Sequence, residues 1–118
     1  MKYFTIKELS HSETAMRMGI NNQPDNEAVK NMRKLIDDVL DPAREALGLP
    51  IIVNSGYRSK RLNCIVGGAA RSYHLCGRAA DVTVGNVSDN RRLYAILRKL
   101  PHVELIWEKG GAWIHVAL

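Results

Sequence analysis

The chain has 118 residues, of which 46% are hydrophobic and 25% are charged, a profile typical of an ordinary globular protein. This length suffices for one hydrophobic core, so we expect residues 1–118 to form a single domain. No apolar run approaches the roughly 20 residues of a membrane-spanning helix, and we therefore expect no membrane span. The 17 lysines and arginines exceed the 12 aspartates and glutamates, and the resulting net charge of +5 favours anionic partners.

The N-terminal part of the chain contains two short helix signals. Thr5 followed by Glu8 has the form of a capping box, and it predicts a short helical turn. The segment 11–22 contains Ser12 and Gly19, and it predicts one short helix and a turn.

A longer amphipathic helix is predicted over residues 25–47, where apolar residues recur at steps of three and four. Pro42 lies inside this pattern and lacks an amide hydrogen. We therefore expect the helix to kink there, or to stop and restart with Asp41 as a new cap. Gly48 and Pro50 mark its end.

The middle of the chain predicts a strand that leads into a loop. The β-branched run 51–54 is typical of a buried strand, and Ser55–Ser59 follows it directly. Arg58 therefore stands just after a strand end, where it can reach into a cleft. One helical turn over 61–66 and a glycine-containing loop over 67–70 are expected next.

The last third of the chain predicts a strand, a helix and a β-hairpin. Residues 79–84 form the strand, and Ser88 is the expected cap of a helix that runs to about Lys99. Residues 104–108 and 113–118 read as the two strands of a hairpin with a glycine turn. Together these elements predict an α+β fold in which a small, mainly antiparallel sheet has helices packed on one side.

A histidine and an aspartate, His74 and Asp81, stand seven positions apart across Gly77 and just before an apolar run. A catalytic zinc ion takes three protein ligands and keeps a further position for water, so a third ligand is needed. His115 is the best candidate, because the alternating segment 113–118 would place its imidazole beside Asp81 in a sheet. The spacing alone also fits an ordinary structural histidine and aspartate.

Three separate sequence motifs together resemble a known protein family. They are Ser-Gly-Tyr-Arg-Ser at 55–59, Ser-x-His-x-x-Gly-x-Ala-x-Asp at 72–81, and Trp-Ile-His-Val at 113–116. Their types and order resemble the zinc D-Ala-D-Ala carboxypeptidases and dipeptidases, their phage endolysin relatives and, more distantly, the hedgehog signalling domain. The resemblance runs from about Ile51 to the C-terminus.

The resemblance implies a zinc-dependent metallopeptidase that hydrolyses peptide bonds in the stem peptides of bacterial peptidoglycan, either as a carboxypeptidase or as an endolysin-type endopeptidase. One Zn²⁺ ion would be held by His74, Asp81 and His115. The family carries a catalytic glutamate before the last histidine, and Glu108 matches that placement, with Glu104 as the reserve candidate for the base.

Three further residues are expected to line the substrate site. Arg58 would bind a substrate carboxylate or carbonyl and assist with charge on the oxyanion, because a guanidinium fork matches a carboxylate in two hydrogen bonds. Ser72 would orient a ligand or its loop. Trp113 stands where several carboxypeptidases have a second histidine, so it would form an apolar cleft wall, and this departure places strict D-Ala-D-Ala specificity in doubt.

The expected partners are peptidoglycan peptides, and we expect a monomer. The basic residues are scattered without interleaved aromatics, so nucleic acid is not expected as a partner. The N-terminus lacks the apolar region of a signal peptide, which predicts cytoplasmic synthesis. The family resemblance implies action on the bacterial cell wall, either after phage-mediated release or in a housekeeping role. Cys64 and Cys76 are expected to be reduced.

Two other functions compete with this assignment. A non-catalytic zinc-binding or wall-binding domain would keep the metal ligands without turnover, and the presence of both Glu108 and Arg58 argues against it. A nucleic-acid-binding module is suggested by the net charge alone.

Overall fold

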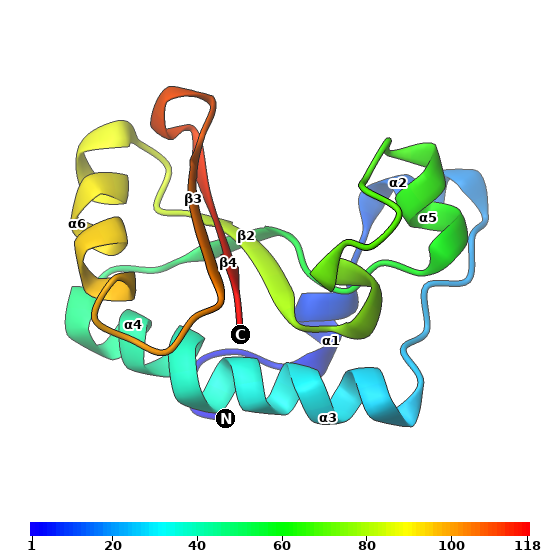
Figure 1. Cartoon of the computed structure of the whole chain (residues 1–118), viewed down its shortest axis with the longest axis horizontal. Coiled ribbons are helices and arrows are strands. Elements are labelled where there is room, and N and C mark those ends of the chain that lie inside the picture. The colour runs from blue at the N-terminus through cyan, green and yellow to red at the C-terminus, as the bar shows by residue number, and fades with distance from the viewer.

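The computed structural model describes residues 1–118 and has one four-stranded antiparallel sheet at its centre (Figure 1). The strand order is β1-β2-β4-β3, with β1 at Ile52–Ser55, β2 at Ala79–Thr83, β3 at Glu104–Glu108 and β4 at Trp113–Ala117. The predicted α+β class is therefore confirmed. None of the helices combines the length and the hydrophobicity needed to cross a membrane.

The helices of the N-terminal half follow their sequence signals closely. The short helices α1 (Ile6–Ser10) and α2 (Glu13–Met18) begin after Thr5 and Ser12, whose hydroxyls accept hydrogen bonds from backbone amides three residues further on. These two caps confirm the N-terminal predictions.

The helix predicted over 25–47 forms three consecutive segments. They are α3 (Asn26–Leu35), the π-helical segment η1 (Ile36–Leu40) and α4 (Asp41–Leu47). The chain neither stops nor restarts at Pro42, because the π turn shifts the hydrogen-bonding pattern by one residue ahead of the proline. Asp41 has helical backbone angles, and its carboxylate accepts the amides of Lys2, Tyr3 and Phe4. The expected role of Asp41 as a cap of its own helix is therefore wrong.

Two other local predictions need correction. The strand β1 lies at an edge of the sheet, and Ile52 is exposed, so β1 is not a buried strand. The helix α6 (Val87–Leu97) is capped by Asn86, whose side chain accepts the amide of Asp89, and not by Ser88. The remaining helices are α5 (Lys60–Ile65) and the 3-10 helices η2 (Tyr73–Cys76) and η3 (Lys109–Gly111).

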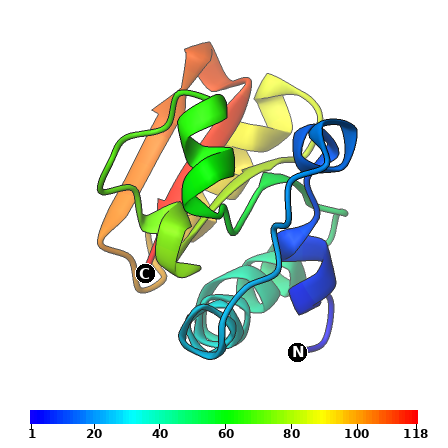
Figure 2. The same cartoon turned by 90° about the vertical axis from the view of Figure 1, so that its right-hand side faces the viewer.

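The two faces of the sheet have different roles. Ala80, Val82, Ile114 and Val116 point into the main core, where they meet side chains of α3, η1, α4 and α6. Alternate residues of the same strands, including Asp81 and His115, face the other side. The helices α6 and α4 lie at one end of the molecule, and α2 and α5 lie at the other (Figures 1 and 2). The long helices thus cover one face, as predicted, whereas η2 brings His74 to Asp81 on the opposite face.

Candidate metal centre and its cleft

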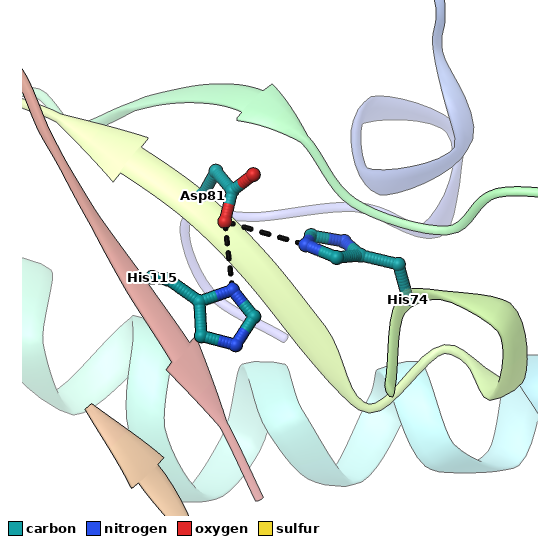
Figure 3. Close-up of side chains that lie close together, drawn as sticks. All are labelled: His74, Asp81 and His115. Atoms are coloured by element: carbon teal, nitrogen blue, oxygen red, sulfur yellow. Dashed lines mark hydrogen bonds and ion pairs between the residues drawn. The ribbon is translucent and has the colours of Figure 1, made fainter. Parts of the chain in front are cut away.

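His74, Asp81 and His115 converge from three elements on one point (Figure 3). Asp81 on β2 and His115 on β4 are direct partners in the antiparallel register, so their side chains lie on the same face of the sheet. His74 comes from η2. Asp81 Oδ1 lies 2.9 Å from His115 Nδ1 and 3.3 Å from His74 Nε2. One donor atom from each residue lies within 4.8 Å of the other two, so the three side chains could hold one metal ion.

Both histidine rings are oriented through their second nitrogen. His74 Nδ1 lies 2.7 Å from the carbonyl oxygen of Gly56, which only accepts hydrogen bonds, so this nitrogen carries a proton and Nε2 is the nitrogen that faces Asp81. His115 Nε2 lies 2.8 Å from Glu104 Oε1. Metal-binding histidines in proteins are commonly held in this way by a carbonyl or a carboxylate.

The packing around Gly56 explains why a glycine stands before Tyr57. A side chain at this position would overlap the carbonyl of Leu9 in α1, because the Tyr57 amide donates to that carbonyl at 2.7 Å. The close approach holds the Gly56 carbonyl in line with His74. Gly56 therefore contributes to the orientation of a candidate metal ligand through its backbone.

The charges of the site are strongly coupled. Burial raises the pKa of Asp81, but hydrogen bonds and attraction from His115 and His74 outweigh it and hold this pKa well below its usual range. The hydrogen bond to Asp81 raises the pKa of His115 despite partial burial, and Glu104 adds to the increase. Asp81 is therefore ionised at neutral pH, as a metal-binding carboxylate has to be.

Arg58 is fixed beside this cluster by side chains from three segments. Its Nε donates to Ser55 Oγ at 3.0 Å, its Nη1 donates to Asn63 Oδ1 at 3.0 Å, and its Nη2 lies 3.5 Å from Asp81 Oδ2. Burial lowers the pKa of Arg58 and the nearby Asp81 carboxylate opposes this, and a guanidinium remains protonated in either case. The two hydrogen bonds use two of its five N–H groups, which leaves others for a ligand.

Asn63 is a site residue that the sequence analysis missed. It is buried, and it links the Arg58 guanidinium to the carbonyl of Ala69 in the loop after α5. Gly68 lies so close that an added side chain would overlap Asn63 and crowd Arg58. Asn63 stands four residues after Ser59, the cap of α5, and no sequence pattern at this position indicates a contact with Arg58.

A cleft of about 620 Å³ opens over the cluster. Its lining includes the three candidate ligands, Arg58 and a basic rim formed by Arg71 and Lys109. Every other candidate from the sequence analysis also borders this cleft: Ser72, Glu104, Glu108 and Trp113. The structure thus brings all the predicted site residues to one place.

The predicted site residues differ in what they contact. Ser72 Oγ accepts a hydrogen bond from the backbone amide of His74 and so caps the N-terminus of η2. This contact is consistent with a role of Ser72 in orienting the loop that carries His74. Glu108 is the last residue of β3 and forms no ion pair, whereas the reserve candidate Glu104 contacts His115 directly. Cys76 is not part of the metal-binding group, since its thiol is directed to the carbonyl of Tyr73, and both cysteines are unpaired.

The fold and the site define a class of protein: a small α+β domain whose central antiparallel sheet carries a His-Asp-His metal-binding group at the base of a cleft. The model of the Peptidase M15 family matches residues 2–117, nearly the whole chain, and the protein belongs to this family.

A curated relative shares a shorter stretch with the chain. The zinc D-Ala-D-Ala carboxypeptidase of Streptomyces albus G is 48% identical over 48 residues. This stretch covers 40% of the present chain and 19% of the relative, so the chain matches only a small part of the relative's length.

Proposed function

We propose that the protein is a zinc-dependent peptidase that hydrolyses peptide bonds in the stem peptides of bacterial peptidoglycan. The observation that carries the proposal is the convergence of His74, Asp81 and His115 at the base of an open cleft that also holds Arg58. Membership of the Peptidase M15 family and the similarity to a zinc D-Ala-D-Ala carboxypeptidase support it.

The donor set suits zinc. Two imidazole nitrogens and one carboxylate oxygen form a typical catalytic zinc set, and a tetrahedral ion at about 2.1 Å from its ligands separates them by about 3.4 Å. The separations of 2.9 Å and 3.3 Å around Asp81 Oδ1 lie near this value. All three donor atoms lie within 4.8 Å of one another, so shifts of the side chains would complete the set around one ion. When bound, zinc would acidify a water molecule and polarise the substrate carbonyl.

Two side chains of the cleft are assigned to the reaction itself. Glu108 faces the cleft without an ion-pair partner, so it is free to accept a proton from the attacking water and to pass it to the leaving amine. Arg58 is held rigidly with spare N–H groups, and it would bind a substrate carboxylate or carbonyl and stabilise negative charge on the carbonyl oxygen.

The rest of the cleft suits an anionic peptide. Arg71 and Lys109 at the rim attract carboxylates, which are abundant in peptidoglycan stem peptides, and Trp113 offers an apolar wall. Ser72 acts through the loop that carries His74. A carboxypeptidase that removes a terminal D-alanine and an endopeptidase of the phage endolysin type, reaching the wall after phage-mediated release, both fit these features.

The decisive experiment is a digestion of purified peptidoglycan with the zinc-loaded protein, followed by mass spectrometry of the muropeptides. We expect new products whose masses identify the cleaved bond, and a chelator should prevent their formation. A mass loss of one terminal alanine would indicate a carboxypeptidase, and an internal cut would indicate an endopeptidase. Binding of the wall without any product would instead favour a non-catalytic zinc-binding or wall-binding domain.

A further inference from the structure

Glu104 contacts a candidate metal ligand from the edge of the sheet. It is the first residue of β3, and His115 lies opposite Ile106, two positions further along the strand. Residues two apart on a strand share a face, so Glu104 and His115 lie on the same side of the sheet. Glu104 Oε1 is 2.8 Å from His115 Nε2.

The orientation of the His115 ring determines which nitrogen is left for a metal. Nδ1 faces Asp81 Oδ1 at 2.9 Å, and the same oxygen is 3.3 Å from His74 Nε2. Nδ1 is therefore the nitrogen that belongs to the cluster. An imidazole that binds a metal through Nδ1 carries its hydrogen on Nε2, and this hydrogen needs an acceptor.

We propose that Glu104 is a positioning residue, whose carboxylate accepts the Nε2 hydrogen of His115 and so holds the ring with Nδ1 directed at the metal. The inference rests on the proposed function, because it takes zinc to be the ion held by His74, Asp81 and His115. It gives the two glutamates of β3 separate tasks. Glu104 orients a ligand, and Glu108 remains free for proton transfer.

The other histidine of the cluster supports this division. His74 has its second nitrogen fixed by the backbone carbonyl of Gly56, so each imidazole has one nitrogen in the cluster and one on a protein acceptor. The two ring nitrogens of His115 point in divergent directions, so the Glu104 carboxylate on Nε2 lies on a different side of the ring from Asp81 on Nδ1. Of the two acceptors, only Glu104 is a side chain that substitution can remove.

Zinc affinity measured by competition with a chromogenic chelator tests the proposal. Glu104→Ala should weaken zinc binding by about 10-fold to 100-fold, the usual effect of removing a group that orients a metal ligand. Glu104→Gln should lose less, because the amide oxygen still accepts the Nε2 hydrogen. Glu108→Gln is the matched control on the same strand, and it should bind zinc as tightly as the parent.

Nuclear magnetic resonance of the ¹⁵N-labelled, zinc-loaded parent gives a second measurement that requires no variant. We expect the hydrogen of His115 on Nε2 and the metal on Nδ1. A metal on Nε2 would overturn the proposal, even if Glu104→Ala failed to fold.

Two results with the variants would also overturn it. One is zinc affinity of Glu104→Ala within two-fold of the parent. The other is a Glu104→Gln protein with full zinc affinity but turnover reduced to the level of Glu108→Gln, which would make Glu104 a base. Tight zinc binding by a parent that cleaves no peptidoglycan would refute the proposed function alone, since the affinity comparison does not depend on turnover.

Discussion

Glu104 and Glu108 lie four residues apart on β3, and their carboxylates have different surroundings. Both face the cleft, but Glu104 is paired with His115 and Glu108 has no ion-pair partner. The sequence pattern ranked Glu108 above Glu104 from its distance to the last histidine. The contacts give a physical reason for the same order, because a base has to be free to take up a proton.

We predict that Glu108→Gln lowers turnover by a factor of roughly 10² to 10⁴, since glutamine keeps the shape of the side chain but cannot accept the proton. Zinc content and the melting temperature should stay unchanged. The measurement is hydrolysis of a defined muropeptide, with metal analysis of the same sample. Turnover within a few-fold of the parent would assign Glu108 to the hairpin structure only.

The role of Arg58 in the cleft was predicted from the sequence, but the side chains that hold its guanidinium in place were not. Its position after β1 indicated a role in a cleft, and the structure adds the hydrogen bonds from its guanidinium to Ser55 and Asn63. A β-bulge between Val53 and Ser55 shifts the register so that Ser55 lies opposite Asp81. Sequence periodicity does not reveal a bulge of one residue, because the strand is only four residues long.

At the scale of elements, a buried asparagine connects α6 to the hairpin. Asn90 is fully buried, its Nδ2 donates to the Gly111 carbonyl at 2.8 Å, and its Oδ1 accepts the Val84 amide at 2.7 Å. Its Nδ2 also lies 3.0 Å from Thr83 Oγ1. This one side chain joins the end of β2, the helix and the turn that follows Glu108.

We predict that Asn90→Ala destabilises the protein by about 2–4 kcal/mol, because it leaves buried backbone groups without hydrogen-bond partners. Urea unfolding of the metal-free protein measures this cost. Asn86→Ala is the matched control, since it removes only the exposed cap of the same helix, and it should cost about 1 kcal/mol. Equal costs for the two variants would contradict the proposed link between α6 and the hairpin.

The whole molecule couples the candidate metal site to folding, because the three ligands come from η2, β2 and β4. A ligand that binds only the folded state stabilises it by mass action. Protons compete with the metal for His115. Raising the pH should therefore weaken the stabilisation that comes from protonated His115 and strengthen the stabilisation that comes from bound metal.

Without metal, the raised pKa of His115 contributes stability that is fully present below the unfolded value of 6.5 and is lost as pH rises through the folded value. The lowered pKa of Asp81 contributes stability above the unfolded value of 3.8, which is lost only as pH falls towards the folded value. We therefore predict that the chelator-treated protein loses stability as pH rises above 6.5. The stabilisation by added zinc should grow over the same range.

Thermal melts at several pH values between 6 and 8, with chelator or with zinc, test this prediction. His115→Ala is the control. It should remove both the loss of stability of the metal-free protein above pH 6.5 and most of the stabilisation by zinc. A zinc-induced shift in melting temperature that is equal at pH 6 and pH 8 would count against His115 as a ligand.

Local sequence signals determined most of the elements of this protein. Caps such as Thr5 and Ser12, the helical periodicity over 25–47 and the alternation over 113–118 act between near neighbours, so they can be recognised without tertiary contacts. The same holds for the spacing of His74 and Asp81, which indicated a metal site when His115 was added. The restart of the helix at Asp41 and the burial of β1 were predicted wrongly, because the role of Asp41 and the edge position of β1 depend on contacts with distant segments.

Only the tertiary structure decided how the site is supported. The Gly56 carbonyl is placed by α1, Asn63 reaches Arg58 from α5, and Glu104 meets His115 through the register of β3 with β4. Each of these contacts joins residues whose distance along the chain carries no periodic signal. Their geometry follows from strand register and helix packing, which arise when the whole core is buried.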